Sequence, residues 1–181
     1  MSAALLVAVV HALPPITVDL RVGFGGTDAV GGEGDAVASF GLEAHVEVQK
    51  GLHVGFTSDV AGSGKWEDVS HGHLGVLFGI GRRRGVLRGT LFSELGVHGI
   101  GGVGDEPTQD ASTVRFGYLG VRGGAELISA KLPIGVGVSL SLRRDLVSQD
   151  GWMVNPEAPG LIAITAGGTE VMFSLHAGAR F

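Results

Sequence analysis

Eight stretches of this sequence alternate apolar and polar residues with a period of two, and none of the eight apolar sets contains a charged residue. Such alternation is the pattern of a β-strand whose two faces meet different surroundings, because successive side chains point to opposite faces. In the stretch 16–24, for example, the apolar positions are Ile16, Val18, Leu20, Val22 and Phe24. Helical periodicity is poor throughout, so the pattern predicts an all-β fold of eight strands.

The segments that connect these stretches differ in length in a regular way. Short links are expected at residues 49–51, 82–85 and 128–131, and long loops at 25–35, 60–70, 99–112 and 144–169. Tight turns at one end and long loops at the other are typical of an antiparallel up-and-down barrel. Across the expected turn at residues 82–85, Glu94 is predicted to lie opposite His73, since both belong to polar sets.

Composition indicates which face of this barrel points outward. Charged residues make up 17% of the chain, only three residues are lysine, and the mean hydropathy is +0.34. The solvent-exposed face of a soluble barrel would be rich in lysine, glutamate and threonine. The polar sets of this chain instead contain mainly Gly, Ser, Arg, Glu and His. That mixture fits a narrow interior, and charge-free apolar faces fit contact with lipid, where Arg or Lys costs about 2–4 kcal/mol. The sequence therefore favours a membrane barrel over a soluble ligand-binding barrel.

Other classes of protein fit poorly. The net charge of −5 argues against nucleic-acid binding, and the absence of cysteine excludes disulfides and thiol catalysis. The longest apolar run, residues 3–10, is too short for a membrane-spanning helix. This run is interpreted as part of a short signal peptide at residues 1–12, which would leave residues 13–181 as a single barrel domain.

The last strand carries a resemblance to a known family. Residues 173–181 alternate and end on the aromatic residue Phe181, and in this they resemble the C-terminal strand of bacterial outer-membrane proteins. Eight strands with tight turns resemble the small barrels of the OmpA transmembrane-domain and OmpX type. The resemblance implies an eight-stranded antiparallel transmembrane barrel in the outer membrane of a Gram-negative bacterium. It also implies that outer-membrane lipids, lipopolysaccharide and the barrel-assembly machinery are partners, the last through Phe181, and that the protein is a monomer.

An eight-stranded barrel has an interior that side chains just fill. The charged residues of the polar sets are therefore expected to pair across the lumen. The predicted lumen network consists of Asp19, Arg21, Glu43, Glu47, Arg88, Glu94, Arg122, Glu126, Arg143, Glu170 and Arg180.

Histidines suggest a second, more specific hypothesis. His71, His73 and His98 are predicted to face the lumen near Glu94 and could ligate a divalent metal, or act as a general base beside Ser70. No nucleophile motif accompanies them, so no catalytic residue and no cofactor is assigned. The expected function is a non-enzymatic structural or interaction role, with acidic loops outside and a charge-plugged lumen. The alternatives are a narrow porin-like channel and, less favoured, a lipid-modifying barrel enzyme.

Overall fold

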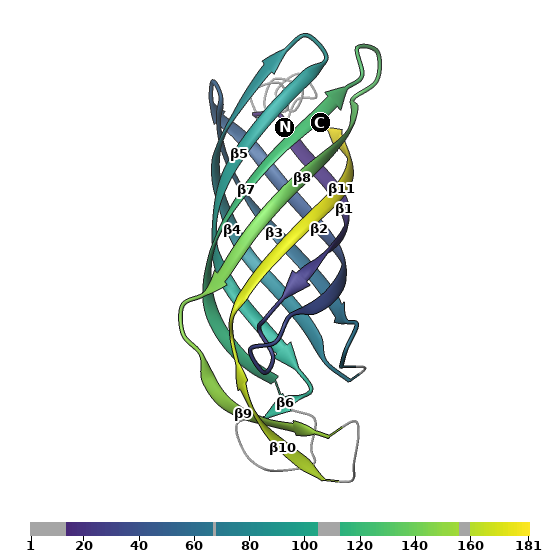
Figure 1. The fold of residues 1–181 in the computed structure, drawn as a ribbon. Helices are drawn as coiled ribbons and strands as arrows, with labels where there is room; N and C mark the ends of the chain where they lie inside the picture. Colours follow the sequence, from purple (N-terminus) through teal and green to yellow (C-terminus); the bar gives the residue numbers. More distant parts are fainter. Residues whose placement is uncertain (1–13, 67, 105–112, 156–159) are drawn as a thin grey trace, which may run out of the picture.

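A computed structural model describes residues 14–66, 68–104, 113–155 and 160–181. Eight long strands close into a barrel in the order β1-β11-β8-β7-β5-β4-β3-β2, with every neighbouring pair antiparallel (Figure 1). They are β1 (Ile16–Thr27), β2 (Asp35–Gln49), β3 (Leu52–Ser63), β4 (Ser70–Arg84), β5 (Leu87–Gly101), β7 (Thr113–Ile128), β8 (Ile134–Asp145) and β11 (Thr169–Arg180). The predicted eight-stranded all-β barrel is confirmed. The expected signal peptide, residues 1–12, lies outside the described residues.

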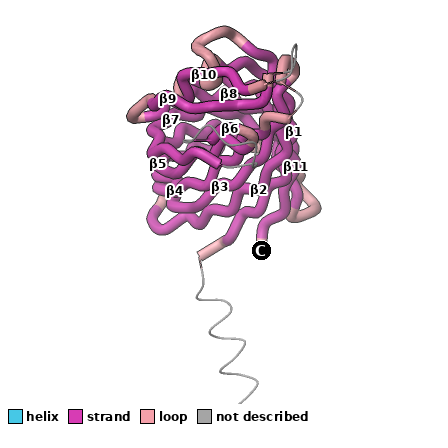
Figure 2. The backbone as a smooth tube through the Cα atoms, turned by 90° about the horizontal axis from the view of Figure 1, so that it is seen from below, coloured by secondary structure: helices cyan, strands magenta, loops and turns pink. Residues whose placement is uncertain are grey.

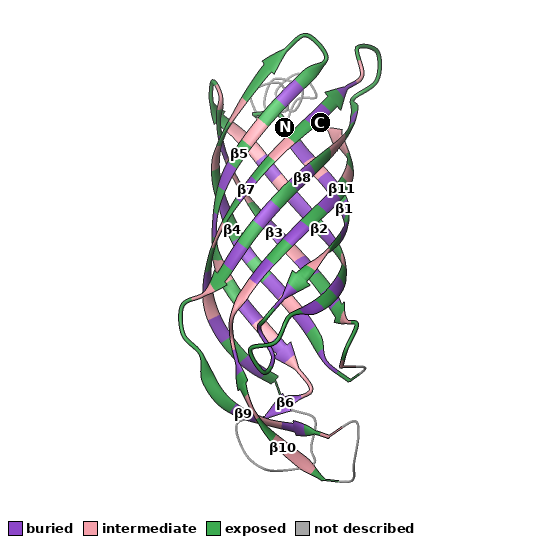
Figure 3. Cartoon of the chain, viewed as in Figure 1, coloured by how far each residue is buried: buried purple, intermediate pink, exposed green. Residues whose placement is uncertain are grey.

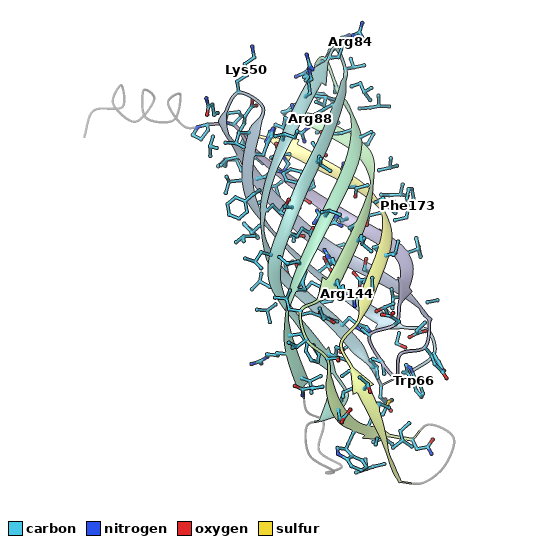
Figure 4. The ribbon with its side chains drawn as sticks, turned by 60° about the vertical axis from the view of Figure 1, so that its left-hand side comes forward. Lys50, Trp66, Arg84, Arg88, Arg144 and Phe173 are labelled. Carbon is cyan, nitrogen blue, oxygen red and sulfur yellow. The ribbon has the colours of Figure 1, made fainter. Side chains whose placement is uncertain are left out.

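The apolar sets face outward along the whole barrel. Buried and exposed residues alternate on each strand, as Figure 3 shows. Leu20 on β1, Phe78 on β4 and Leu140 on β8 are each more than half exposed, and Phe173 projects from the wall of the barrel (Figure 4). Among the described residues no helix is long and apolar enough to span a membrane.

The two ends of the barrel differ, and the first strand begins at the same end at which the last strand finishes (Figure 1). The turn end carries the links β2–β3, β4–β5 and β7–β8, and Lys50 and Arg84 extend from two of its tips (Figure 4). The opposite end, the loop end, carries the longer connections. Because the strand number is even, β1 begins and β11 finishes at the turn end, where Ile16 and Phe181 exchange backbone hydrogen bonds.

The hairpin between β4 and β5 corrects one prediction. The expected turn at residues 82–85 is wrong, because β4 continues through all three arginines to Arg84 and pairs it with Leu87. The turn consists of Gly85 and Val86 alone, and Gly85 takes a positive φ of 63°, which glycine adopts without strain. This two-residue turn shifts the register, so that Glu94 lies opposite Leu77 rather than opposite His73.

The loop end corrects a second prediction, because two of the expected loops contain strands. A separate three-stranded sheet of order β10-β9-β6 is formed by β6 (Val103–Gly104), β9 (Gln149–Val154) and β10 (Leu161–Ala166). Figure 2 looks at this end and shows the small sheet on one side of the barrel mouth, next to β7 and β8. Its strands are only two to six residues long, so they leave little alternation in the sequence.

Candidate functional site

The centre of the lumen is organised around Arg143 on β8. Its Nη2 lies 2.7 Å from Asp59 Oδ2, its Nε lies 2.7 Å from Glu94 Oε2, and its Nη1 lies 3.0 Å from Glu170 Oε1. Round the barrel, β8 and β3 are four strands apart, which is half the circumference. The pair between Arg143 and Asp59 therefore crosses the full width of the lumen.

A second crossing lies beside the first. Arg122 on β7 contacts both Glu43 on β2 and Glu94 on β5, and β7 and β2 are again on opposite sides of the barrel. Arg21 on β1 lies 3.6 Å from the same Glu43 carboxylate and donates a hydrogen bond of 3.2 Å to Thr57. Charge-assisted contacts to two carboxylates at once hold the Arg122 guanidinium in one orientation.

Nearer the turn end, the charged residues behave in two ways. Glu126 binds Arg88 at 2.6 Å and lies 3.4 Å from Arg180. The other two residues predicted for the network lack arginine partners among the described contacts. Glu47 accepts a hydrogen bond from the Gly51 amide at 2.6 Å, within its own turn, and Asp19 is buried with its Oδ1 atom unpaired.

The three histidines proposed as metal ligands do come together near the loop end. His71 Nδ1 lies 3.1 Å from His98 Nε2, and the rings of His73 and His98 stack at 4.2 Å between centroids. Glu94 does not join them as a ligand opposite His73, since its carboxylate is held by Arg122 and Arg143.

Carboxylates pair with His98 and His73, while His71 Nε2 makes no hydrogen bond. His98 Nδ1 is 3.0 Å from Asp145 and His73 Nδ1 is 3.0 Å from Asp59. Within the described residues, no serine or threonine hydroxyl, Ser70 included, is hydrogen-bonded to any of the three histidines. The three histidines therefore form a hydrogen-bonded layer with Asp59 and Asp145.

Apolar side chains close the lumen at the loop end. Ile100, Val103, Val114, Phe116 and Met153 are buried in one cluster that joins the barrel strands to β6 and β9. Beside this cluster a groove of about 640 Å³ is lined by both tryptophans of the chain, Trp66 and Trp152, together with Glu33 and Asp150.

The groove is bordered by an exposed ion pair between Lys65 and Glu33. The Lys65 ammonium group also lies 4.8 Å from the centroid of the Trp66 ring. Its charge and hydrogen bond hold the pKa of Glu33 below the ordinary value for a glutamate.

The turn end of the lumen is hollow by comparison. Small side chains, Gly81, Thr90 and Gly124, line a cavity of about 1000 Å³ there, with Lys50 and Arg83 at its edge. The lumen thus changes along its axis from an open vestibule, through a charged centre, to an apolar lid.

Several residues of this lumen escaped the sequence prediction. Asp59 and Asp145 are absent from the predicted lumen network, but they lie in β3 and β8 and bind Arg143 and His98. Their parity on the strands was the available signal, because each continues the polar set of its strand. Leu77 and Phe92, which interrupt the polar sets, are buried in the lumen.

A closed antiparallel barrel with an apolar exterior and a charged interior defines a class: the chain has the fold of the small integral outer-membrane barrels. No protein-family model matches the sequence, and no curated protein matches it either. Among solved structures, the outer membrane protein OprG from Pseudomonas aeruginosa is similar at a TM-score of 0.64 with 10% sequence identity, over 93% of this chain and 96% of that one. Neisserial surface protein A (NspA) is similar at a TM-score of 0.60 with 9% identity, over 92% of this chain and 96% of that one.

Proposed function

We propose that this protein is a non-conducting, non-enzymatic barrel of the outer membrane whose working surface is its loop end. The observation that carries the proposal is the pair of arginine bridges, Arg143 to Asp59 and Arg122 to Glu43, because each spans the lumen between opposite strands. The buried apolar lid at the loop end adds a second barrier. A path for ions through the barrel would have to break both.

The orientation follows from the type of barrel. In barrels of this kind the short turns are periplasmic and the longer loops are extracellular, so the turn end faces the periplasm and the sheet of β6, β9 and β10 faces outward. Acidic side chains on this outer surface, such as Glu33 and Asp150, suit divalent cations that bridge to lipopolysaccharide phosphates. The C-terminal strand, ending in Phe181, is the expected contact for the barrel-assembly machinery.

A non-enzymatic role is supported by the chemistry of the lumen. The histidines of the loop-end group, His71, His73 and His98, are bound to one another and to carboxylates. The arginines of the centre are bound to carboxylates. Side chains that are already paired in this way stabilise the structure, and they are not free to bind a substrate inside a filled lumen.

Conductance in a planar bilayer tests the proposal. The refolded protein is expected to insert without stepwise currents. A double variant, Arg122→Ala with Arg143→Ala, removes both bridges but keeps the apolar lid, so it is expected to pass current only when the lid is opened as well, for example by adding Ile100→Ala. Stable unitary conductance of the unaltered protein would establish the porin-like alternative. A mass change of lipid A or phospholipid incubated with the protein would establish the lipid-modifying alternative.

A further inference from the structure

Asp19 on β1 is a buried carboxylate that forms no salt bridge with an arginine or lysine among the described residues. It is 4% exposed, and its Oδ1 atom makes no hydrogen bond. The neighbouring strand β11 makes room for Asp19 with a glycine, because a Cβ added at Gly178 would collide with this same oxygen. An unpaired carboxylate is costly to bury, so such a group either takes up a proton or binds a cation.

Two further ligand groups face Asp19 from the neighbouring strand. The register of β1 and β2 places Glu43 directly opposite Asp19, and His45 follows two residues later on the same lumen face. One ligand atom from each of the three lies within 4.8 Å of the other two, and Asp19, Glu43 and His45 are all buried. Among the described residues no other set of His, Asp or Glu side chains converges in this way.

Several potential ligand atoms of this group make no hydrogen bond. His45 is 3% exposed and neither ring nitrogen makes a hydrogen bond, although Nδ1 lies 3.3 Å from Glu43 Oε1. Arg21 and Arg122 approach Glu43 through its other oxygen, Oε2, which leaves Oε1 directed at His45. Hence one oxygen of each carboxylate and an imidazole nitrogen are available together.

The charge of the lumen favours a cation here. The buried residues described include seven carboxylates, against four arginines. The arginines bind Glu43, Asp59, Glu94, Glu126 and Glu170. Asp19 and Asp35 have no arginine, but Asp35 accepts hydrogen bonds from the Ser63 hydroxyl and the Lys65 amide at the loop end. A divalent ion beside Asp19 would offset part of this excess where no arginine reaches.

We infer that Asp19, Glu43 and His45 form a binding site for a divalent transition-metal ion between β1 and β2. One imidazole with two carboxylates suits ions such as Zn²⁺ better than Ca²⁺ or Mg²⁺, which take oxygen ligands alone. The ligands come from two adjacent, hydrogen-bonded strands, so the site is positioned by regular sheet and not by a loop. The ion would tie β1 to β2 near the turn end.

Metal analysis of the refolded barrel tests this inference. Protein stripped with a chelator and then dialysed against Zn²⁺ is expected to retain one equivalent. Asp19→Asn and His45→Gln are expected to weaken binding by more than the ~10–100-fold that substitutions around a metal site cost. Asp35→Asn, a buried acid at the loop end, and His71→Gln are the matched controls and are expected to retain the ion. Each variant is compared as a folded barrel, judged by its heat-dependent mobility in dodecyl sulfate.

Two outcomes would overturn the inference. One is a refolded protein that retains less than half an equivalent of Zn²⁺, in which case Asp19 is a protonated buried acid. The other is retention that survives Asp19→Asn and His45→Gln but is lost with His71→Gln, which would place the ion at the histidine group of the loop end. Should the two site variants fail to refold, Zn²⁺ is expected to raise the temperature of the mobility shift of the unaltered protein, and no rise would count against the site.

Discussion

At the loop end the lumen is closed by Ile100, Val103 and Met153, whereas at the turn end Gly81, Thr90 and Gly124 surround a cavity of about 1000 Å³. Both ends belong to the same eight strands and share the same apolar exterior. The difference shows that contact with lipid determines the outward-facing residues, which are apolar along the whole barrel. The lumen-facing residues differ from one level of the lumen to the next. Substitutions can therefore change one level and leave the wall intact.

The largest effect is expected at the charged centre that separates the two ends. Arg143→Met leaves Asp59, Glu94 and Glu170 without their shared partner, and breaking a buried ion pair in this way costs about 3–5 kcal/mol. The free energy of unfolding in urea, measured in detergent or bilayers, checks this. Arg144→Met is the matched control, because Arg144 is the next residue on β8 and points outward, so its loss should cost far less. Equal losses would mean that the central network adds nothing to the stability of the barrel.

The lid at the loop end should come next. Ile100 is fully buried in the apolar cluster, and Ile→Ala in a packed core costs about 2–5 kcal/mol. Thr90→Ala at the turn end touches a hollow region and should change the free energy of unfolding by about 0.5 kcal/mol or less. The two variants are compared in the same urea titration. A loss for Thr90→Ala as large as that for Ile100→Ala would mean that the turn-end cavity is packed.

The wall of this barrel could be predicted from the sequence more fully than its contents. Every second residue of a barrel strand faces the lipid, as Leu20 and Phe173 do, so the alternation alone identifies the outward positions. The crossing pairs depend on which residues of opposite strands share a level, and that is set by register. A two-residue turn at Gly85 instead of the expected four residues moved Glu94 from His73 to Leu77. The polar sets thus identified most members of the lumen network, with Asp59 and Asp145 missed, but the pairing of these members depended on a register that the sequence did not show.

A third prediction concerns how far water-soluble reagents can enter the lumen; it does not concern stability. The chain has no cysteine, so a single introduced thiol reports on its own position. Thr90→Cys, in the turn-end cavity, is expected to react with a water-soluble thiol reagent in the folded barrel. Ser141→Cys, which faces the buried centre of the lumen, is expected to stay unlabelled until the protein is denatured. Labelling of Ser141→Cys in the folded state would show that water reaches the centre.

The smallest effect is expected at the exposed rim of the loop end, where Lys65 holds the pKa of Glu33 below its ordinary value. A lowered pKa means that the pair stabilises the loop at neutral pH, and this stabilisation is lost as the pH falls through the folded-state pKa of Glu33. The Lys65 ammonium group lies over the Trp66 ring, so Trp66 fluorescence in a Trp152→Phe background should report the loss.

The midpoint of this fluorescence change is expected below the ordinary glutamate value of about 4.3. Lys65→Met removes the charge that lowers the pKa, and it tests the assignment through the titration of Glu33 itself, followed by NMR. In that variant the midpoint should rise to the ordinary value. An unchanged midpoint would mean that Glu33 is held by another group, and the groove between Trp66 and Trp152 would then keep its shape without the ion pair. Because the Lys65–Glu33 pair is exposed to solvent, salt should weaken it. The bridges in the buried centre should respond little to salt. A salt titration therefore distinguishes the rim of the loop end from the lumen beneath it.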